Sequence, residues 1–219
     1  MPPVISYAFT PISGYAYLGH DRLREIARSA GASVEFRPFD IGQVFAATGT
    51  VPPAKQSPAR LAYRQADMTR WARRLGLRFN ATPKWWPVDA TLASRTIIAS
   101  EMMGASPWAV TAAILAGVWA DESNIADGAQ LASLLENAGI AAAALIDAAS
   151  CDEVSARYAS NTAWAIETGV FGSPTYGLGH DLFWGQDRLD FLAEGLGREQ
   201  SKPAPPVAVV TGGAMDPLT

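Results

Sequence analysis

The chain has 219 residues, of which 49% are hydrophobic and 17% are charged. Disordered chains combine low hydrophobicity with high charge, so this composition predicts a folded protein with a substantial core. The formal net charge of −4 argues against a nucleic-acid-binding protein, which usually shows a basic surface. No apolar run approaches the roughly 18 residues of a membrane span, so we expect neither a nucleic-acid nor a membrane partner.

The cysteine and histidine content excludes several kinds of chemistry. Cys151 is the single cysteine, so an intramolecular disulfide, a Cys-x-x-Cys redox centre and a cysteine-rich zinc site are all excluded. His20 and His180 lie far apart, so no metal site is expected. No nucleophile elbow, P-loop or dinucleotide-binding glycine motif occurs. The cysteine usage and the absence of a secretory leader after Met1 favour a cytoplasmic location.

The first predicted elements form a β–α–β unit. Residues 4–9 read as a short strand, and Ser13 is placed as the N-cap of a helix that Gly31 closes. Residues 34–37 read as a second strand that Pro38 stops. A parallel strand pair with a crossover helix is therefore expected.

The middle of the chain is predicted to be helical after an initial loop. Residues 40–56 are rich in Gly, Thr and Pro and are predicted to form a loop. Ser57-Pro58 then begins a helix, and a capping box at Ser150–Glu153 opens the last one. The predicted helices run over residues 58–75, 91–103, 107–119, 128–138, 141–149 and 150–168.

The C-terminal part returns to strands. Residues 175–178 and 182–184 flank a hairpin signal at Gly179-His180-Asp181. A last helix is predicted over 187–196 with Gly197 as its stop, and residues 201–219 are predicted to be a loose tail.

This layout predicts an α/β protein with a thioredoxin-like β-α-β…β-β-α domain, interrupted by an all-helical insertion domain. The thioredoxin-like domain comprises residues 1–56 and 169–200, and the insertion domain comprises residues 57–168. The usual reactive position of such a sheet is the start of its first helix, which here reads Ser13-Gly-Tyr-Ala16 where a redox protein carries Cys-x-x-Cys.

Ser13 lies where backbone N–H groups and the helix dipole favour an anion, so its hydroxyl is a candidate donor to a thiolate brought by a ligand. No histidine or acid near it in sequence suggests a general base, which argues against a serine nucleophile. The alternative is a plain N-cap that contributes about 1 kcal/mol.

Two further segments carry candidate binding groups. Pro174 precedes a strand at the position where a cis-proline presents the backbone of Ser173 to an extended ligand; the alternative is an ordinary trans-proline. Gly185 permits close backbone approach, and N–H groups beside it are able to hold a carboxylate while Asp187 holds an ammonium. The alternative is that Asp187 is only a favourable first-turn acid.

Several segments together resemble the 2-hydroxychromene-2-carboxylate isomerase family, which is related to kappa-class glutathione transferases. The resemblance runs from about Ile5 to Leu196. The segments that carry it are Ser13–Leu18, Arg37-Pro38, Val44-Phe45, Thr48-Gly49, Tyr63, Asp67–Ala72, Gly169–Thr175 and Phe183–Leu189. The family implies a homodimer, a glutathione cofactor and a small aromatic carboxylate substrate.

The resemblance also implies roles for individual residues. Ser13 matches the serine that hydrogen-bonds the glutathione sulfur, and Ser173 before Pro174 matches the residue that pairs with the glutathione backbone. The turn that holds the γ-glutamyl end matches Trp184, Gly185, Gln186 and Asp187. The loops that contact substrate in the family offer Phe45, Lys55, Arg60 and Trp85, and for Trp85 the alternative is core packing.

The sequence departs from the family pattern at four positions. The family usually has an acid at the position of Thr10 and a proline at that of Gly14. It commonly has an asparagine near Thr50 and a lysine near Arg60. The glutathione half of the site therefore matches the family better than the substrate half. The resemblance implies a glutathione-dependent cis–trans isomerase of 2-hydroxychromene-2-carboxylate or a related intermediate of aromatic-ring degradation. The alternatives are a kappa-class-like transferase that conjugates small electrophiles and a non-catalytic thioredoxin-like module that binds glutathione or a peptide.

Overall fold

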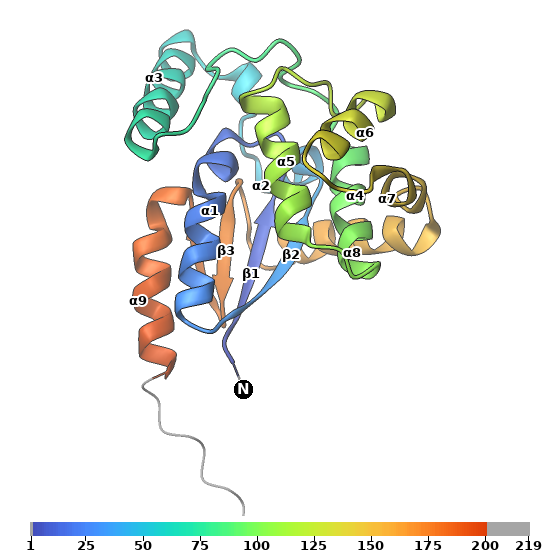
Figure 1. The fold of residues 1–219 in the computed structure, drawn as a ribbon. Coiled ribbons are helices and arrows are strands. Elements are labelled where there is room, and N and C mark those ends of the chain that lie inside the picture. Colours follow the sequence, from blue (N-terminus) through green and yellow to red (C-terminus); the bar gives the residue numbers. More distant parts are fainter. Residues whose placement is uncertain (1, 201–219) are drawn as a thin grey trace, which may run out of the picture.

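The computed structural model describes residues 2–200, so the tail predicted at 201–219 lies outside the described residues. A four-stranded sheet has the order β2-β1-β3-β4 (Figure 1). The strands are β1 (Val4–Phe9), β2 (Ser33–Pro38), β3 (Thr175–Leu178) and β4 (Asp181–Trp184). β1 is parallel to β2 and antiparallel to β3, and β3 and β4 form the predicted hairpin. The predicted thioredoxin-like sheet is confirmed.

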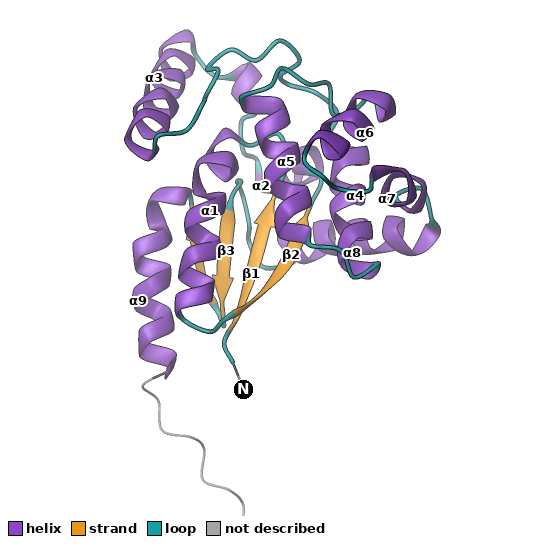
Figure 2. Ribbon diagram, in the orientation of Figure 1, coloured by secondary structure: helices purple, strands orange, loops and turns teal. Residues whose placement is uncertain are grey.

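Helices cover the sheet and form the long segment between β2 and β3 (Figure 2). α1 and α9 lie side by side on one face, α4 and α8 pack against β2, and α3 stands at the top against α1 (Figure 1). The α-helices are α1 (Gly14–Ser29), α2 (Ile41–Thr48), α3 (Pro58–Leu75), α4 (Thr91–Met102), α5 (Pro107–Trp119), α6 (Gly128–Asn137), α7 (Ala142–Ala148), α8 (Asp152–Glu167) and α9 (Leu189–Gln200). Two 3₁₀ turns are η1 (Pro53–Lys55) and η2 (Gln186–Arg188).

Local capping signals account for most helix starts. The side chains of Ser13, Ser57 and Ser106 accept hydrogen bonds from backbone N–H groups three residues later, as N-caps do. Gly76 follows α3 with a φ of 68°, a conformation that glycine adopts at little cost. These predicted boundaries are confirmed.

The loop predicted over residues 40–56 is wrong, because α2 and η1 lie within it. Asp40 is the N-cap of α2, and its carboxylate accepts hydrogen bonds from the N–H groups of Gly42 and Gln43. Gly49 ends the helix with a φ of 72°. The apolar residues between these two caps include Val44, whose buried side chain packs in a cluster with Phe39 and Val170.

Two smaller predictions about helix ends are also wrong. Cys151, and not Ser150, is the N-cap of α8, and no side-chain hydrogen bond caps this helix, so the predicted capping box does not form. Gly197 does not stop the last helix, since α9 continues to Gln200 after the 3₁₀ turn η2. A glycine inside a helix weakens it by only about 1 kcal/mol, which the rest of a helix readily overcomes.

The core connects the sheet with the inserted helices. Tyr7 on β1 stacks on Phe9 and on Tyr176, with ring centroids 4.2 and 5.6 Å apart. The same cluster of buried side chains extends to Trp119 on α5. The Nε2 atom of His20 on α1 lies 3.1 Å from the carbonyl oxygen of Trp108 on α5. The contact between α1 and α5 therefore holds the insertion against the sheet.

The close approach of α1 to η2 predicts the effect of Gly19→Ala. A Cβ atom at Gly19 would lie 2.7 Å from both Gln186 Cβ and the hydroxyl oxygen of Tyr176, which is closer than packed atoms approach. We expect this change to lower the free energy of unfolding by about 1–3 kcal/mol, measured by urea denaturation. Gly197→Ala is the matched control, because nothing lies within 4 Å of its Cβ position. Equal losses in the two variants would contradict this packing argument.

His20 predicts a pH dependence of stability. Burial lowers the pKa of His20 from 6.5 to about 4, while the Trp108 carbonyl and Asp21 oppose this and Arg24 adds to it. Between these values the unfolded chain binds a proton that the folded chain does not, so stability falls as the pH falls through this window. We expect a loss of about 2 kcal/mol between pH 7 and pH 5, measured by denaturation at each pH. His20→Asn should lack this component, and an unchanged slope would sink the assignment.

Candidate functional site

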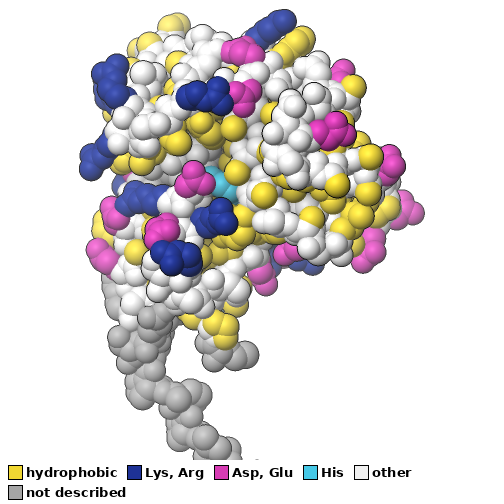
Figure 3. Space-filling model, in the orientation of Figure 1, with side chains coloured by type: hydrophobic (Ala, Val, Ile, Leu, Met, Phe, Trp, Pro, Cys, Tyr) yellow, Lys and Arg dark blue, Asp and Glu magenta, His cyan; other side chains and the backbone are white. Residues whose placement is uncertain are grey.

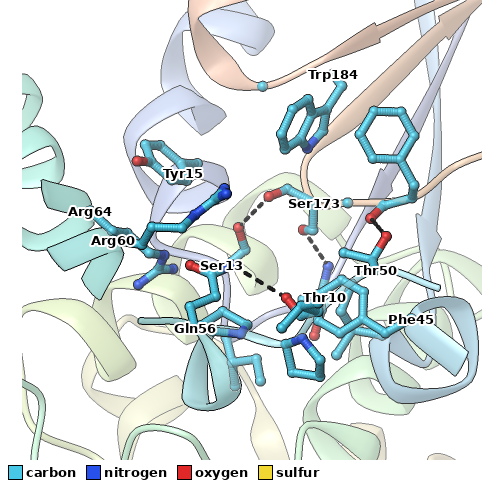
Figure 4. Close-up of a pocket in the computed structure, with 18 of the residues that line it drawn as sticks. Thr10, Ser13, Tyr15, Phe45, Thr50, Gln56, Arg60, Arg64, Ser173 and Trp184 are labelled. Carbon is cyan, nitrogen blue, oxygen red and sulfur yellow. Dashed lines mark hydrogen bonds between the residues drawn. The ribbon is translucent and has the colours of Figure 1, made fainter. Parts of the chain in front are cut away.

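A pocket of about 950 Å³ opens where α1 begins, and this volume is near the upper end of the ~300–1,000 Å³ typical of small-molecule sites (Figure 4). One wall comes from the start of α1, the loop before β3 and the turn at η2. The opposite wall comes from α2, the segment around η1, α3 and the loop that holds Trp86. The two walls belong to parts of the chain that are far apart in sequence.

Ser13 lies at the junction of these walls and is 7% exposed. Its hydroxyl donates to the carbonyl oxygen of Ser173 at 2.8 Å and accepts from the N–H of Ala16 at 3.2 Å (Figure 4). A hydroxyl has one proton, so Ser13 donates to the anion of a ligand only after its hydroxyl turns away from the Ser173 carbonyl. Within the described residues, the N–H groups of Gly14 and Tyr15 have no acceptor, which leaves two more donors at the helix start.

Ser173 joins the loop before β3 to the end of β1. Its Oγ accepts from the N–H of Thr10 at 2.9 Å, and the N–H of Ser13 donates to the carbonyl of Thr10 at 3.0 Å. The Ser173-Pro174 peptide bond is cis, as predicted. The backbone N–H of Ser173 has no acceptor among residues 2–200 and is therefore available to a ligand.

The turn after β4 adds a buried amide. Gln186 is 1% exposed, and neither its side-chain nitrogen nor its side-chain oxygen has a partner within the described chain. An unpaired buried amide costs free energy, which is a reason to expect a ligand or an ordered water beside it. Gly185 has a φ of 98°, a conformation that favours glycine, and its N–H donates to the carbonyl of Pro174 at 2.9 Å. The carboxylate of Asp187 accepts from Arg188 at 2.8 Å.

Trp184 packs closely over the loop before β3. A Cβ atom at Gly172 would lie 2.3 Å from Trp184 Nε1, so the indole fits only because position 172 is glycine. The ring of Trp184 also contacts Phe171, with centroids 4.8 Å apart, and 53% of Trp184 is exposed. These two rings form an apolar rim at the pocket entrance.

The α3 wall carries charge among aromatic rings. The hydroxyl of Tyr15 donates to the carboxylate of Asp67 at 3.0 Å, and burial together with this carboxylate raises the pKa of Tyr15 well above its ordinary value. The guanidinium of Arg64 lies 5.0 Å from the ring centroid of Trp86 and 5.7 Å from that of Tyr15. Arg60 projects from the same helix at an exposed position.

The structure brings together most of the residues predicted from the sequence. Those that line the pocket are Ser13, Phe45, Arg60, Ser173, Trp184, Gly185, Gln186 and Asp187. Lys55 does not line it, although its neighbours Ala54 and Gln56 do. Trp85 also points elsewhere, since its Nε1 donates to the carbonyl of Glu122 at 3.1 Å.

Sequence reasoning did not single out several residues of the pocket. Trp86 lines it instead of Trp85, and its Nε1 donates to the carbonyl of Ile12 at 2.9 Å. Arg64 lies one helical turn after Arg60, a spacing that places both side chains on one face of α3 and is visible in the sequence. Thr10, singled out from the sequence only as a departure from the family, also lines the pocket, with a buried Oγ1 that has no partner within residues 2–200.

Two structural tests bear on other classes of site. No cluster of three or more His, Cys, Asp or Glu side chains suited to a metal ion occurs within residues 2–200. In the same part of the chain, every helix is too short or too polar to span a bilayer.

The chain is similar to a known protein family and to curated proteins. The family described as DSBA-like thioredoxin domain matches residues 5–197. Two curated proteins named 2-hydroxychromene-2-carboxylate isomerase, from Pseudomonas putida and from Pseudomonas sp. (strain C18), are 30% and 31% identical to this chain. Each match covers 89% of this chain, and they cover 95% and 90% of the two relatives.

The chain is also similar to solved structures. A 2-hydroxychromene-2-carboxylate isomerase is similar with a TM-score of 0.75 and 25% identity, over 90% of this chain and 96% of that chain. The cytosolic disulfide reductase DsbM from Pseudomonas aeruginosa, solved with GSH, has a TM-score of 0.63 and 19% identity over 90% of this chain and 98% of its own. The second similarity shows a shared fold.

The Ser173–Thr10 contact predicts the effect of Ser173→Ala. The change removes the side-chain oxygen that accepts the hydrogen bond of the Thr10 N–H. Because Thr10 is only 3% exposed, this N–H is left without a partner, and we expect a loss of about 1–2 kcal/mol in the free energy of unfolding. Ser155→Ala is the control, because its hydroxyl bonds only within an exposed turn of α8. Chemical denaturation compares the two, and a loss at Ser173 no larger than at Ser155 would refute the predicted role.

Proposed function

The chain belongs to the DSBA-like thioredoxin domain family and, within it, to the 2-hydroxychromene-2-carboxylate isomerase family; from this premise we propose that it is a glutathione-dependent cis–trans isomerase. Its proposed substrate is 2-hydroxychromene-2-carboxylate or a related intermediate of aromatic-ring degradation. The observation that carries the proposal is the meeting of Ser13, the open helix start and the backbone of Ser173 at one pocket.

The residues of the wall formed by the start of α1, the loop before β3 and the turn at η2 fit glutathione. The buried amide of Gln186 lacks a partner within the described residues and therefore suits the peptidic, zwitterionic part of such a ligand. The backbone N–H of Ser173, which has no acceptor within the described residues, is able to pair with an extended peptide. Asp187 and the turn at Gly185 would hold its γ-glutamyl end, with the carboxylate of Asp187 facing the ammonium.

The chain itself offers no thiol at the pocket. Cys151 is exposed at the N-cap of α8 and is not part of the pocket lining. A serine stands where a redox protein of this fold has a reactive cysteine, so the sulfur must come from a ligand. The disulfide reductase of the same fold that was solved with GSH illustrates such a ligand in another protein.

Glutathione, when bound, supplies a thiolate nucleophile that is regenerated, so that a double bond isomerises without net use of thiol. The role of Ser13 is to turn its hydroxyl from the Ser173 carbonyl toward the sulfur and to stabilise its negative charge. The N–H groups of Gly14 and Tyr15 add the positive end of the α1 dipole at the same place. Phe45 and Trp86 present apolar rings that exclude water and orient a flat substrate.

We further propose that the protein acts as a homodimer in the cytoplasm. The family resemblance supports the dimer, and a glutathione requirement together with a chain that has a single cysteine supports the compartment. Light scattering after gel filtration measures the oligomeric state directly, and a monomer at micromolar concentration would refute the first part.

The central test is turnover by the wild type and by Ser13→Ala. The assay follows the absorbance of 2-hydroxychromene-2-carboxylate with glutathione present and counts free thiols before and after. We expect loss of substrate with an unchanged thiol count, and about a 100-fold lower kcat for Ser13→Ala, because preorganised donors to a developing or bound anion contribute on this scale.

Ser106→Ala is the matched control, since Ser106 caps α5 in the same way and does not line the pocket. It should lose the capping energy and keep its turnover. Full activity in Ser13→Ala would contradict the proposed role of Ser13 as a hydrogen-bond donor to the thiolate. A falling thiol count would indicate a transferase that conjugates electrophiles, and absence of glutathione binding at millimolar concentration would exclude both enzymes.

A further inference from the structure

The pocket contains a cation that the proposed cofactor site does not use. Arg64 lies on α3 and lines the pocket, one turn after Arg60 on the same helix face (Figure 4). α3 carries five arginines and one acid, Asp67. Basic side chains lie over α3 on the face drawn in Figure 3, acidic and basic ones are mixed over α1, and acidic ones predominate over α6 and α7.

The guanidinium of Arg64 is surrounded by aromatic rings from three elements. It lies 5.7 Å from the ring centroid of Tyr15 on α1, 5.0 Å from that of Trp86 and 5.9 Å from that of Trp119 on α5. Trp119 is fully buried, so this side of the cation faces the core. A guanidinium stacks on aromatic faces while its edge keeps several N–H donors free.

No acid neutralises this cation within residues 2–200. None of the ion pairs there includes Arg64, and its guanidinium has no hydrogen-bond partner in that part of the chain. Asp67 is engaged by the hydroxyl of Tyr15. Burial lowers the pKa of Arg64, which only the Tyr15 hydroxyl opposes, yet an arginine remains protonated at neutral pH. A partly buried cation that no acid in that part of the chain neutralises favours an anionic ligand in the pocket.

We infer that Arg64 binds the carboxylate of a flat aromatic acid whose ring lies against Trp86 and Tyr15. This inference rests on the proposed function and names the group that selects its substrate class. The planar guanidinium matches a carboxylate through two parallel N–H···O bonds, which a lysine does not provide. It also replaces Lys55, which does not line the pocket, as the carboxylate partner.

Glutathione also carries carboxylates, so two sources of the same group must be separated. The substrate is the better match, because Arg64 is half-buried among rings on the α3 side of the pocket. The donors suited to a peptide, Ser173 and Gln186, lie on the opposite wall. Arg60, by contrast, is exposed on α3.

The experiment measures binding, so it does not depend on turnover. Trans-cinnamate and its neutral carboxamide are titrated by calorimetry into wild-type protein, Arg64→Gln and Arg64→Lys, with glutathione titrated separately. We expect wild type to bind the acid at least tenfold more tightly than the amide, Arg64→Gln to bind both equally, and Arg64→Lys to keep only part of the preference. The Kd for glutathione should change less than twofold.

Arg73→Gln is the matched control, because it removes the same charge from an exposed position of α3 outside the pocket. It should keep the full preference for the acid, and thermal melting checks that each variant is folded. A tenfold preference that survives in Arg64→Gln, or its absence in wild type, would overturn the inference. Weaker glutathione binding with an unchanged acid preference would assign Arg64 to glutathione instead. Acid binding that depends on Arg64 without isomerisation would leave this inference standing and refute the proposed function.

Discussion

The site depends on one small hydrogen-bond network that joins three segments of the thioredoxin-like part. Ser13 donates to the carbonyl of Ser173, and Ser173 in turn accepts from the N–H of Thr10. Antiparallel pairing of Ala8 with Thr175 brings these segments within reach. Glycines then allow the surrounding elements to close in, since a Cβ atom at Gly14 would lie 2.6 Å from the sulfur of Met68 on α3. The pocket therefore exists because backbone and small side chains meet at the start of α1.

Much of this arrangement can be predicted from the sequence because its signals are local. Serine N-caps, glycines after helices and the β–β hairpin report on only a few residues each, and together they are enough to predict the thioredoxin-like sheet and the position of Ser13. α2 was harder to foresee, because its eight residues lie in a segment whose Gly, Thr and Pro content indicates a loop. The signal that indicates the helix is the Asp40 cap followed by a short apolar run.

The substrate side of the pocket shows where local signals end. Trp85 and Trp86 are adjacent and chemically identical, and their directions are set by distant carbonyls, those of Glu122 and Ile12. Neither partner is visible from the sequence around the tryptophans. Lys55 and Arg64 differ in the same way, because only the packing of α3 against α1 determines which cation lines the pocket. Tertiary contacts therefore decide the residues that distinguish one substrate from another.

The two walls of the pocket divide the chemistry between two parts of the chain. The wall from α1, the cis-proline loop and η2 offers backbone N–H groups, a hydroxyl and a buried amide, which suit a peptide thiol. The wall from α3 and the Trp86 loop offers rings and the guanidinium of Arg64, which no acid neutralises within residues 2–200, and these groups suit an aromatic acid. Substitutions on α3 alter the second wall without changing the Ser13–Ser173 contact. The substrate that the pocket accepts is therefore able to change while the thiol site stays the same. One pocket thus combines a serine hydroxyl at the start of α1 with a facing wall of aromatic rings and an arginine, and each wall presents a different chemistry to a ligand.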